Sequence, residues 1–106
     1  SDEGTGVTTD SSGNIYVTGY TEGDLDGNTS SVYSDIFLIK YNSSGTKQWT
    51  KQLGTNSMES GNGVTTDSSG NIYVTGSTYP GGLDGNTSSG SYDIFLVKYN
   101  SSGIKQ

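Results

Sequence analysis

One loop of the sequence carries oxygen-bearing side chains at a spacing that suits a hard cation. Asp24, Asp26 and Asn28 occupy alternate positions around a glycine, and Asp84 and Asn86 recur in the matching loop later in the chain. Carboxylate and amide oxygens that converge from one loop are the ligands that calcium prefers. The pattern predicts calcium at these five residues, and no other cofactor. The alternative is a tight turn held by hydrogen bonds from side chain to backbone.

Tyrosines close to the same loops have the chemistry of a sugar-binding surface. A tyrosine presents an apolar ring with a polar end, which suits stacking on a sugar and bonding to its hydroxyls. The candidates for ligand binding are Tyr20, Tyr33, Tyr79 and Tyr92. The alternative is that these rings, together with Trp49, pack between neighbouring sheets, where a chain with few aliphatic residues needs bulk.

Four asparagines match the acceptor pattern for N-linked glycans, in which a serine or threonine follows two residues later. They are Asn28, Asn42, Asn86 and Asn100. All four lie at expected turns and loops, where a glycan would have room. We therefore retain them as glycosylation candidates.

The composition argues against catalysis, nucleic-acid binding and membrane insertion. The chain has no His and no Cys, so it lacks an imidazole base and a thiolate nucleophile. Its net charge is −6 and it contains no Arg, so it lacks the basic surface that binds phosphate backbones. Its longest apolar run, 36–39, is far shorter than the roughly 20 residues of a membrane span. We expect no enzyme activity and no catalytic residues.

The sequence is a tandem repeat. Residues 6–19 recur unchanged as 63–76, and residues 35–48 recur as 93–106 with two differences, Ile39 to Val97 and Thr46 to Ile104. We expect two units, 1–57 and 58–106, of which the second lacks the counterpart of its outermost strand. The phase of the repeat also suggests that the sequence is an excerpt of a longer array.

Each repeat reads as four short strands. Residues rich in Val, Ile, Tyr and Phe predict strands near 6–10, 15–20, 35–42 and 46–54. Serine-glycine turns at 11–14 and 43–45 would make tight hairpins, with glycine supplying the positive φ. The predicted fold class is all-β, a four-stranded antiparallel meander in each repeat.

The third strand of each repeat is apolar on both sides. Ile36 and Leu38 point one way, whereas Phe37 and Ile39 point the other. Such a strand predicts a sheet that is covered on both faces. Sheets stacked face to face are how β-propeller blades pack, and two blades alone cannot cover their own outer faces.

The residues that carry this pattern also carry a family resemblance. The segments 10–19, 25–28 and 35–45 resemble the SBBP-type β-propeller repeat and, more distantly, the NHL repeat. The resemblance implies propeller blades from large secreted or surface-exposed bacterial or archaeal proteins, used as scaffold or binding modules. It implies no reaction and no catalytic residues.

The sequence therefore predicts a non-catalytic extracellular repeat module for scaffolding or adhesion. Expected partners are other copies of the repeat, in the same chain or in a homo-oligomer, and surface glycans or proteins; nucleic acid and a membrane span are not expected. Two alternatives remain open. One is a lectin-like or calcium-binding propeller that holds ligands in its middle loops, and the other is a linear stack of blades that forms an extracellular filament.

Overall fold

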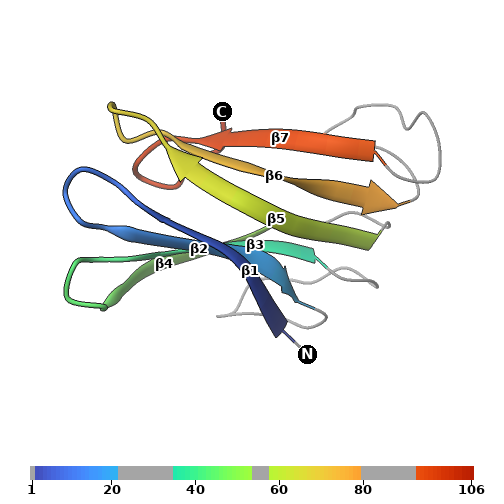
Figure 1. Ribbon diagram of the computed structural model, residues 1–106, viewed down its shortest axis with the longest axis horizontal. Helices are drawn as coiled ribbons and strands as arrows, with labels where there is room; N and C mark the ends of the chain where they lie inside the picture. The colour runs from blue at the N-terminus through green and yellow to red at the C-terminus, as the bar shows by residue number, and fades with distance from the viewer. Residues whose placement is uncertain (1, 22–34, 54–57, 80–92) are drawn as a thin grey trace.

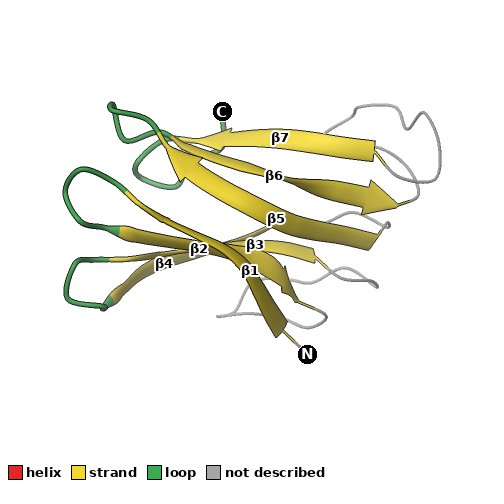
Figure 2. Cartoon of the chain, viewed as in Figure 1, coloured by secondary structure: helices red, strands yellow, loops and turns green. Residues whose placement is uncertain are grey.

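The computed structural model describes residues 2–21, 35–53, 58–79 and 93–106, and these form two antiparallel sheets without a helix (Figures 1 and 2). The first sheet has the order β1-β2-β3-β4, with β1 (Asp2–Thr9), β2 (Ile15–Thr21), β3 (Asp35–Tyr41) and β4 (Lys47–Leu53). The second has the order β5-β6-β7, with β5 (Met58–Thr66), β6 (Ile72–Tyr79) and β7 (Asp93–Tyr99). The predicted all-β meander is confirmed. The division predicted after residue 57 falls at the end of 54–57, outside the described residues.

The tight turns form where the serine-glycine pairs predicted them. Gly13, Gly45, Gly70 and Gly103 all have φ between 83° and 85°. In this left-handed region glycine avoids the clash that a Cβ would cause. The four turns also share the same pair of backbone hydrogen bonds, so they are copies of one turn.

The first strand of each repeat is longer than the sequence predicted. β1 begins at Asp2 rather than residue 6, and β5 begins at Met58. Both strands carry a bulge, between Gly4 and Gly6 in β1 and between Gly61 and Gly63 in β5. Glycine and short polar residues have low strand propensity, which hides these segments from a pattern search. Pairing with β2 and β6 holds them extended, and the bulge absorbs the extra residue.

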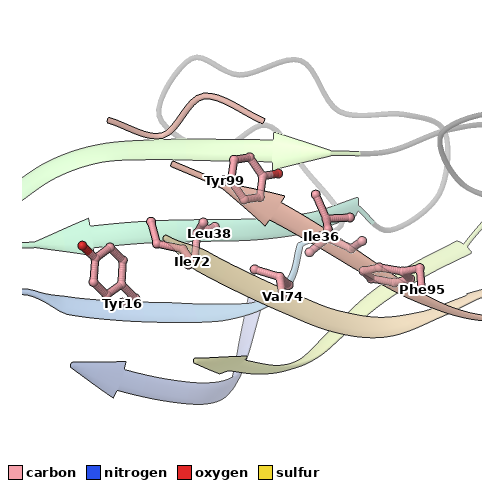
Figure 3. Close-up of a cluster of buried hydrophobic side chains, with 8 residues drawn as sticks. Tyr16, Ile36, Leu38, Ile72, Val74, Phe95 and Tyr99 are labelled. Carbon is pink, nitrogen blue, oxygen red and sulfur yellow. The ribbon is translucent and has the colours of Figure 1, made fainter. Parts of the chain in front are cut away.

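A shared core lies between the two sheets, as Figure 3 shows. The first sheet contributes Tyr16, Ile36 and Leu38, and the second contributes Ile72, Val74, Phe95, Val97 and Tyr99. Trp49 and Val64 pack against its rim. β5 runs across β1, β2 and β3, so the strand that begins the second repeat lies on the first sheet. Neither sheet buries this apolar surface without the other.

The expectation that both faces of each sheet are covered is met only where the two sheets meet, because one face of each sheet has no described partner sheet. In β3, the exposed fractions of Ile36, Phe37 and Leu38 are 4%, 5% and 2%. In β7, Ile94 and Leu96 are 89% and 70% exposed. The difference arises because the first sheet covers one side of the second, whereas no described sheet lies on its other side.

Candidate interaction surface

Alternation along the strands gives each sheet two unlike faces. We call the side with Ile36 and Leu38, and with Ile94 and Leu96 in the second sheet, the leucine face. The opposite side is the tyrosine face, and it carries Tyr41 or Tyr99. Strand register extends both faces onto the neighbouring strands, because residues paired across antiparallel strands share a side. On the leucine face, Thr18 lies opposite Leu38 and Thr75 lies opposite Leu96. On the tyrosine face, Val17 lies opposite Ile39 and Val74 lies opposite Val97.

The leucine face of the first sheet packs on the tyrosine face of the second. Leu38 and Tyr16 meet Ile72, Val74 and their neighbours in a single buried cluster. The contact is therefore heterologous, since two different surfaces of one repeat meet. At this interface the first repeat contributes its leucine face and the second repeat its tyrosine face.

Two hydrogen bonds tie the sheets together at their turn ends. The Thr66 hydroxyl donates to the carbonyl oxygen of Thr9 at 3.0 Å. The Lys40 ammonium donates to the carbonyl oxygen of Ser101 at 3.2 Å, and its Nζ lies 5.7 Å from the centre of the Tyr16 ring. Such a cation above an aromatic ring is favourable. These bonds fix how the second sheet is placed on the first.

Trp49 adds an aromatic contact at the outer part of the same interface. Its ring centre lies 6.3 Å from that of Tyr16, and the planes are tilted by 51°. A Cβ added to Gly103 would lie 3.0 Å from carbon atoms of both Trp49 and Lys51. The backbone of the second sheet thus approaches the indole closely, and Trp49 acts in packing.

One face of each sheet is left without a described partner sheet. On the leucine face of the second sheet, Ile94 and Leu96 are exposed beside Thr75 and Lys98, and Lys98 Nζ lies 5.7 Å from the centre of the Tyr73 ring. On the tyrosine face of the first sheet, Val7 is 66% exposed. It adjoins four half-buried residues, Ile15, Val17, Ile39 and Tyr41. These two surfaces are the candidate sites.

The aspartate at the first hairpin turn of each repeat is engaged in the turn itself. Asp10 Oδ1 accepts from the backbone N–H groups of Ser12 and Asn14, at 2.9 and 3.0 Å. Its Oδ2 accepts from Asn14 Nδ2 at 3.0 Å and from the Tyr16 hydroxyl at 2.8 Å. Asp67 repeats all four bonds one repeat later. Asp10 and Asp67 therefore cap their turns.

Electrostatics in these turns favours ionised carboxylates and neutral phenols. Burial works to raise the pKa of Asp10, but the bonds from Asn14 and Tyr16 outweigh it and leave that pKa below its usual value. The side-chain bond from Asn71, followed by its backbone bond and that of Tyr73, lowers the pKa of Asp67 to about 2. Burial, reinforced by the bond to Asp10, raises the pKa of Tyr16. The carboxylates are therefore structural anions.

A polar cleft of about 360 Å³ opens between the turn ends of the two sheets. Serine residues from three turns line it together with Asp10 and Lys40: Ser11 and Ser12, Ser68 and Ser69, and Ser101. Both of those charged groups already bond within the protein, Asp10 to its turn and Lys40 to Ser101. The cleft therefore offers serine hydroxyl groups to a ligand, whereas its two charged side chains are already engaged in hydrogen bonds within the protein.

Most residues that the sequence singled out lie outside the described part of the chain. These are Asp24, Asp26, Asn28, Tyr33, Asp84, Asn86 and Tyr92; Tyr79 belongs to β6, but its side chain is not among those described. Tyr20 is half-buried in β2 and its hydroxyl donates to the Glu3 carboxylate. The predicted calcium and sugar sites stay predictions.

The two glycosylation candidates among the described residues, Asn42 and Asn100, form hydrogen bonds that close their own turns. Asn42 Oδ1 accepts from the backbone N–H groups of Ser44 and Thr46, at 3.0 and 2.9 Å. Asn100 makes the same pair of bonds to Ser102 and Ile104. Each asparagine thus closes a hairpin in the way that an aspartate closes the preceding one.

Sequence reasoning missed the polar contacts that join the two sheets. Lys40 and Ser101 are 61 positions apart, and Thr9 and Thr66 are 57 apart, so no local spacing connects them. The signal that was available is the exact recurrence of these residue types in both repeats. Within the described residues, no group of three or more acidic, His or Cys side chains gathers to hold a metal.

Comparison with known protein families agrees with this architecture. The SBBP family model, a beta-propeller repeat, matches residues 1–26 and 48–81. The first segment includes β1 and β2, and the second includes the matching pair, β5 and β6. A search of curated proteins found no match. The family model covers more than half of the chain, and the two matched segments contain equivalent strand pairs of stacked antiparallel sheets: the chain belongs to the SBBP β-propeller repeat family.

Proposed function

We propose that the chain is a non-catalytic scaffold module of an extracellular protein, whose blades present a polar outer surface for adhesion. The observation that carries the proposal is the heterologous packing of one repeat on the next, which lets blades be added without a change of contact. The module is thus a means of building surface area, and its function lies in what that surface displays.

The state of the polar side chains supports a role without chemistry. Asp10 and Asp67 have both carboxylate oxygens engaged in turn bonds, and these bonds favour the ionised form. General acid or base catalysis needs a group that can exchange a proton near neutral pH. A carboxyl whose pKa is about 2, such as that of Asp67, is a poor candidate for this work.

The surface composition supports an extracellular location. Strands and turns are rich in Ser, Thr, Asn and Gly, and 11 acidic residues oppose five lysines. A net charge of −6 keeps such a chain soluble through mutual repulsion. The absence of cysteine in the sequence also leaves no thiol for an oxidising environment to attack.

The test is to locate the protein and then to measure adhesion. An antibody raised against the 106-residue chain is applied to intact and to lysed producing cells. We expect labelling of intact cells or of the medium, and we expect beads coated with the chain to adhere to those cells. Labelling that requires lysis would contradict the extracellular proposal.

Ligand measurements separate the scaffold from the ligand-binding alternative. Calorimetry with calcium and a glycan array are applied to the same chain, with an unrelated acidic β-protein as the control. The scaffold proposal expects no stoichiometric calcium uptake and no saturable binding of one glycan. Either result, if found, would replace the scaffold with a lectin-like or calcium-binding function.

A further inference from the structure

We infer that a second copy of this chain docks on the exposed leucine face of the second sheet through the tyrosine face of its own first sheet. Copies would then join head to tail. The inference deepens the proposed scaffold function and rests on it, because it names the partner and the surface through which the scaffold grows.

The surface that fits the exposed face is visible inside the chain. Ile36 and Leu38 are covered by five residues of the second sheet, Ile72, Val74, Phe95, Val97 and Tyr99. Their counterparts in the first sheet are Ile15, Val17, Phe37, Ile39 and Tyr41. Four of the five are identical, and the fifth exchanges Val for Ile. Phe37 is only 5% exposed, so the surface that a second copy offers consists mainly of the half-buried residues Ile15, Val17, Ile39 and Tyr41.

The receiving face is also a copy of one that is already covered. Ile94 and Leu96 repeat Ile36 and Leu38, and Tyr73, Thr75 and Lys98 repeat Tyr16, Thr18 and Lys40. The hydrogen bond from the threonine hydroxyl to the third strand is the same in both sheets, at 2.9 Å. The cation above the tyrosine ring is the same as well, at 5.7 Å. The exposed face thus has the shape of the covered one.

The polar links of the internal interface have their equivalents between copies. Lys98 Nζ corresponds to Lys40 Nζ, so it would donate to the carbonyl oxygen of Ser43 in the incoming copy, as Lys40 does to Ser101. The Thr9 hydroxyl of the incoming copy would donate to the Thr66 carbonyl, as Thr66 does to Thr9. These bonds would set the same register between copies as within one.

One contact of the internal interface has no equivalent. Gly103 packs on Trp49 and Lys51, but the second repeat in this sequence contains no tryptophan. Gly45 of an incoming copy, around whose Cβ position nothing lies within 4 Å, would meet no indole. The interface between copies is therefore smaller than the one within the chain, and we expect association to depend on concentration.

Because the two surfaces differ, such an interface propagates. A heterologous contact forms a ring when the rotation between copies closes and an open filament when it does not. Each copy contributes two sheets, so a ring would hold an even number of blades. Both arrangements leave one type of interface to test.

The first experiment measures the mass of the full 106-residue chain by sedimentation velocity, from roughly 10 µM to 1 mM, a range that captures weak association. We expect species at multiples of 11.1 kDa that grow with concentration. The double variant Ile94→Thr/Leu96→Thr removes the apolar face and keeps strand propensity, and it should lose these species. Ile104→Thr is the matched control, since Ile104 is 60% exposed, follows β7 and lies beside Tyr99 and Lys51, and the first repeat has Thr46 there. It should assemble like the natural chain.

The second experiment tests the head-to-tail pairing by mixing two variants. Val7→Asp/Ile39→Thr impairs only the tyrosine face of the first sheet, and Ile94→Thr/Leu96→Thr impairs only the leucine face of the second. Each variant alone should be a monomer. An equimolar mixture should give a dimer of one copy of each and nothing larger. Circular dichroism of each variant verifies that the sheets are retained.

Three outcomes would overturn the inference. They are a natural chain that stays monomeric over the whole range, an Ile94→Thr/Leu96→Thr variant that still assembles, and a Val7→Asp/Ile39→Thr variant that dimerises alone. The last would mean that two leucine faces pack on each other. The cell-labelling and ligand experiments test the scaffold proposal separately. Failure of that proposal can therefore be distinguished from failure of the docking inference.

Discussion

Asp67 and its three bonding partners make one hairpin turn sensitive to acid. Its pKa is about 2 in the folded chain against an ordinary 3.8. Between these values the unfolded chain binds a proton that the folded chain does not, so falling pH favours unfolding. The contribution of Asp67 is therefore fully present above pH 3.8 and lost as the pH falls through about 2.

We predict that Asp67→Asn weakens the loss of stability between pH 4 and pH 2. Asparagine closes the equivalent turn at Asn42 and Asn100 with the same pair of backbone bonds, so the substitution removes the titration and keeps the turn. Urea midpoints at several pH values measure the effect. Adding Asp10→Asn should make the urea midpoint depend still less on pH, because the pKa of Asp10 is also lowered. Ser68→Ala, in the same turn, is the control and should lose as much stability between pH 4 and pH 2 as the natural chain. The same loss of stability in Asp67→Asn would contradict the prediction.

Gly45 isolates the cost of a left-handed backbone from that of crowding. Its φ is 85°, and a Cβ there would meet nothing within 4 Å. We predict that Gly45→Ala lowers the free energy of unfolding by about 1–2 kcal/mol, the cost of a Cβ in this region. Gly45→Asn should cost less, because asparagine tolerates the region better. Equal losses for both variants, measured by urea unfolding, would show that the conformation is not the cause.

At the scale of strands, equal residues in the two repeats meet unequal surroundings. Leu38 is 2% exposed in the shared core, whereas Leu96, at the same repeat position, is 70% exposed. We predict that Leu38→Ala lowers the free energy of unfolding by roughly 2–5 kcal/mol, as buried leucines do. Leu96→Ala should cost no more than about 0.5 kcal/mol, as surface changes do. The comparison is made in dilute solution, so that association does not contribute. Similar losses for both would contradict the observed burial.

Sequence pattern was sufficient for β2, β3 and the turns, and insufficient for β1 and for the stacking of sheets. Alternating apolar residues and serine-glycine turns are local signals, so the strands and turns that they form can be predicted from the sequence alone. The segment before Gly6 has glycine and polar residues, and only its pairing with β2 makes it a strand. Both faces of β3 are apolar, so alternation alone does not tell which face meets the next repeat. That choice depends on the fit between residues some 60 positions apart, such as Lys40 and Ser101.

For the candidate surfaces, the repeat pattern explains why apolar surface is exposed but does not predict where. Two blades cannot cover their own outer faces, which predicts exposed apolar surface somewhere. In the folded chain, Ile94 and Leu96 are exposed, whereas Ile36 and Leu38 are buried. The oxygen ligands and tyrosines that first suggested chemistry belong mainly to the loops outside the described residues. Their spacing alone does not determine how they converge.

For the molecule as a whole, the shared core makes the two sheets dependent on each other. Trp49, the single tryptophan, belongs to the first sheet and touches the second at Gly103, so its fluorescence reports the interface. Ile72 is fully buried in the second sheet. We predict that Ile72→Ala lowers stability by roughly 2–5 kcal/mol and shifts the transitions seen by Trp49 fluorescence and by circular dichroism together. Among the described residues, neither sheet has a second apolar layer of its own, so both should unfold in one step. If the two probes separate in this variant, with the Trp49 signal changing before the strands are lost, the sheets are independent units and the interface is not what holds the fold together.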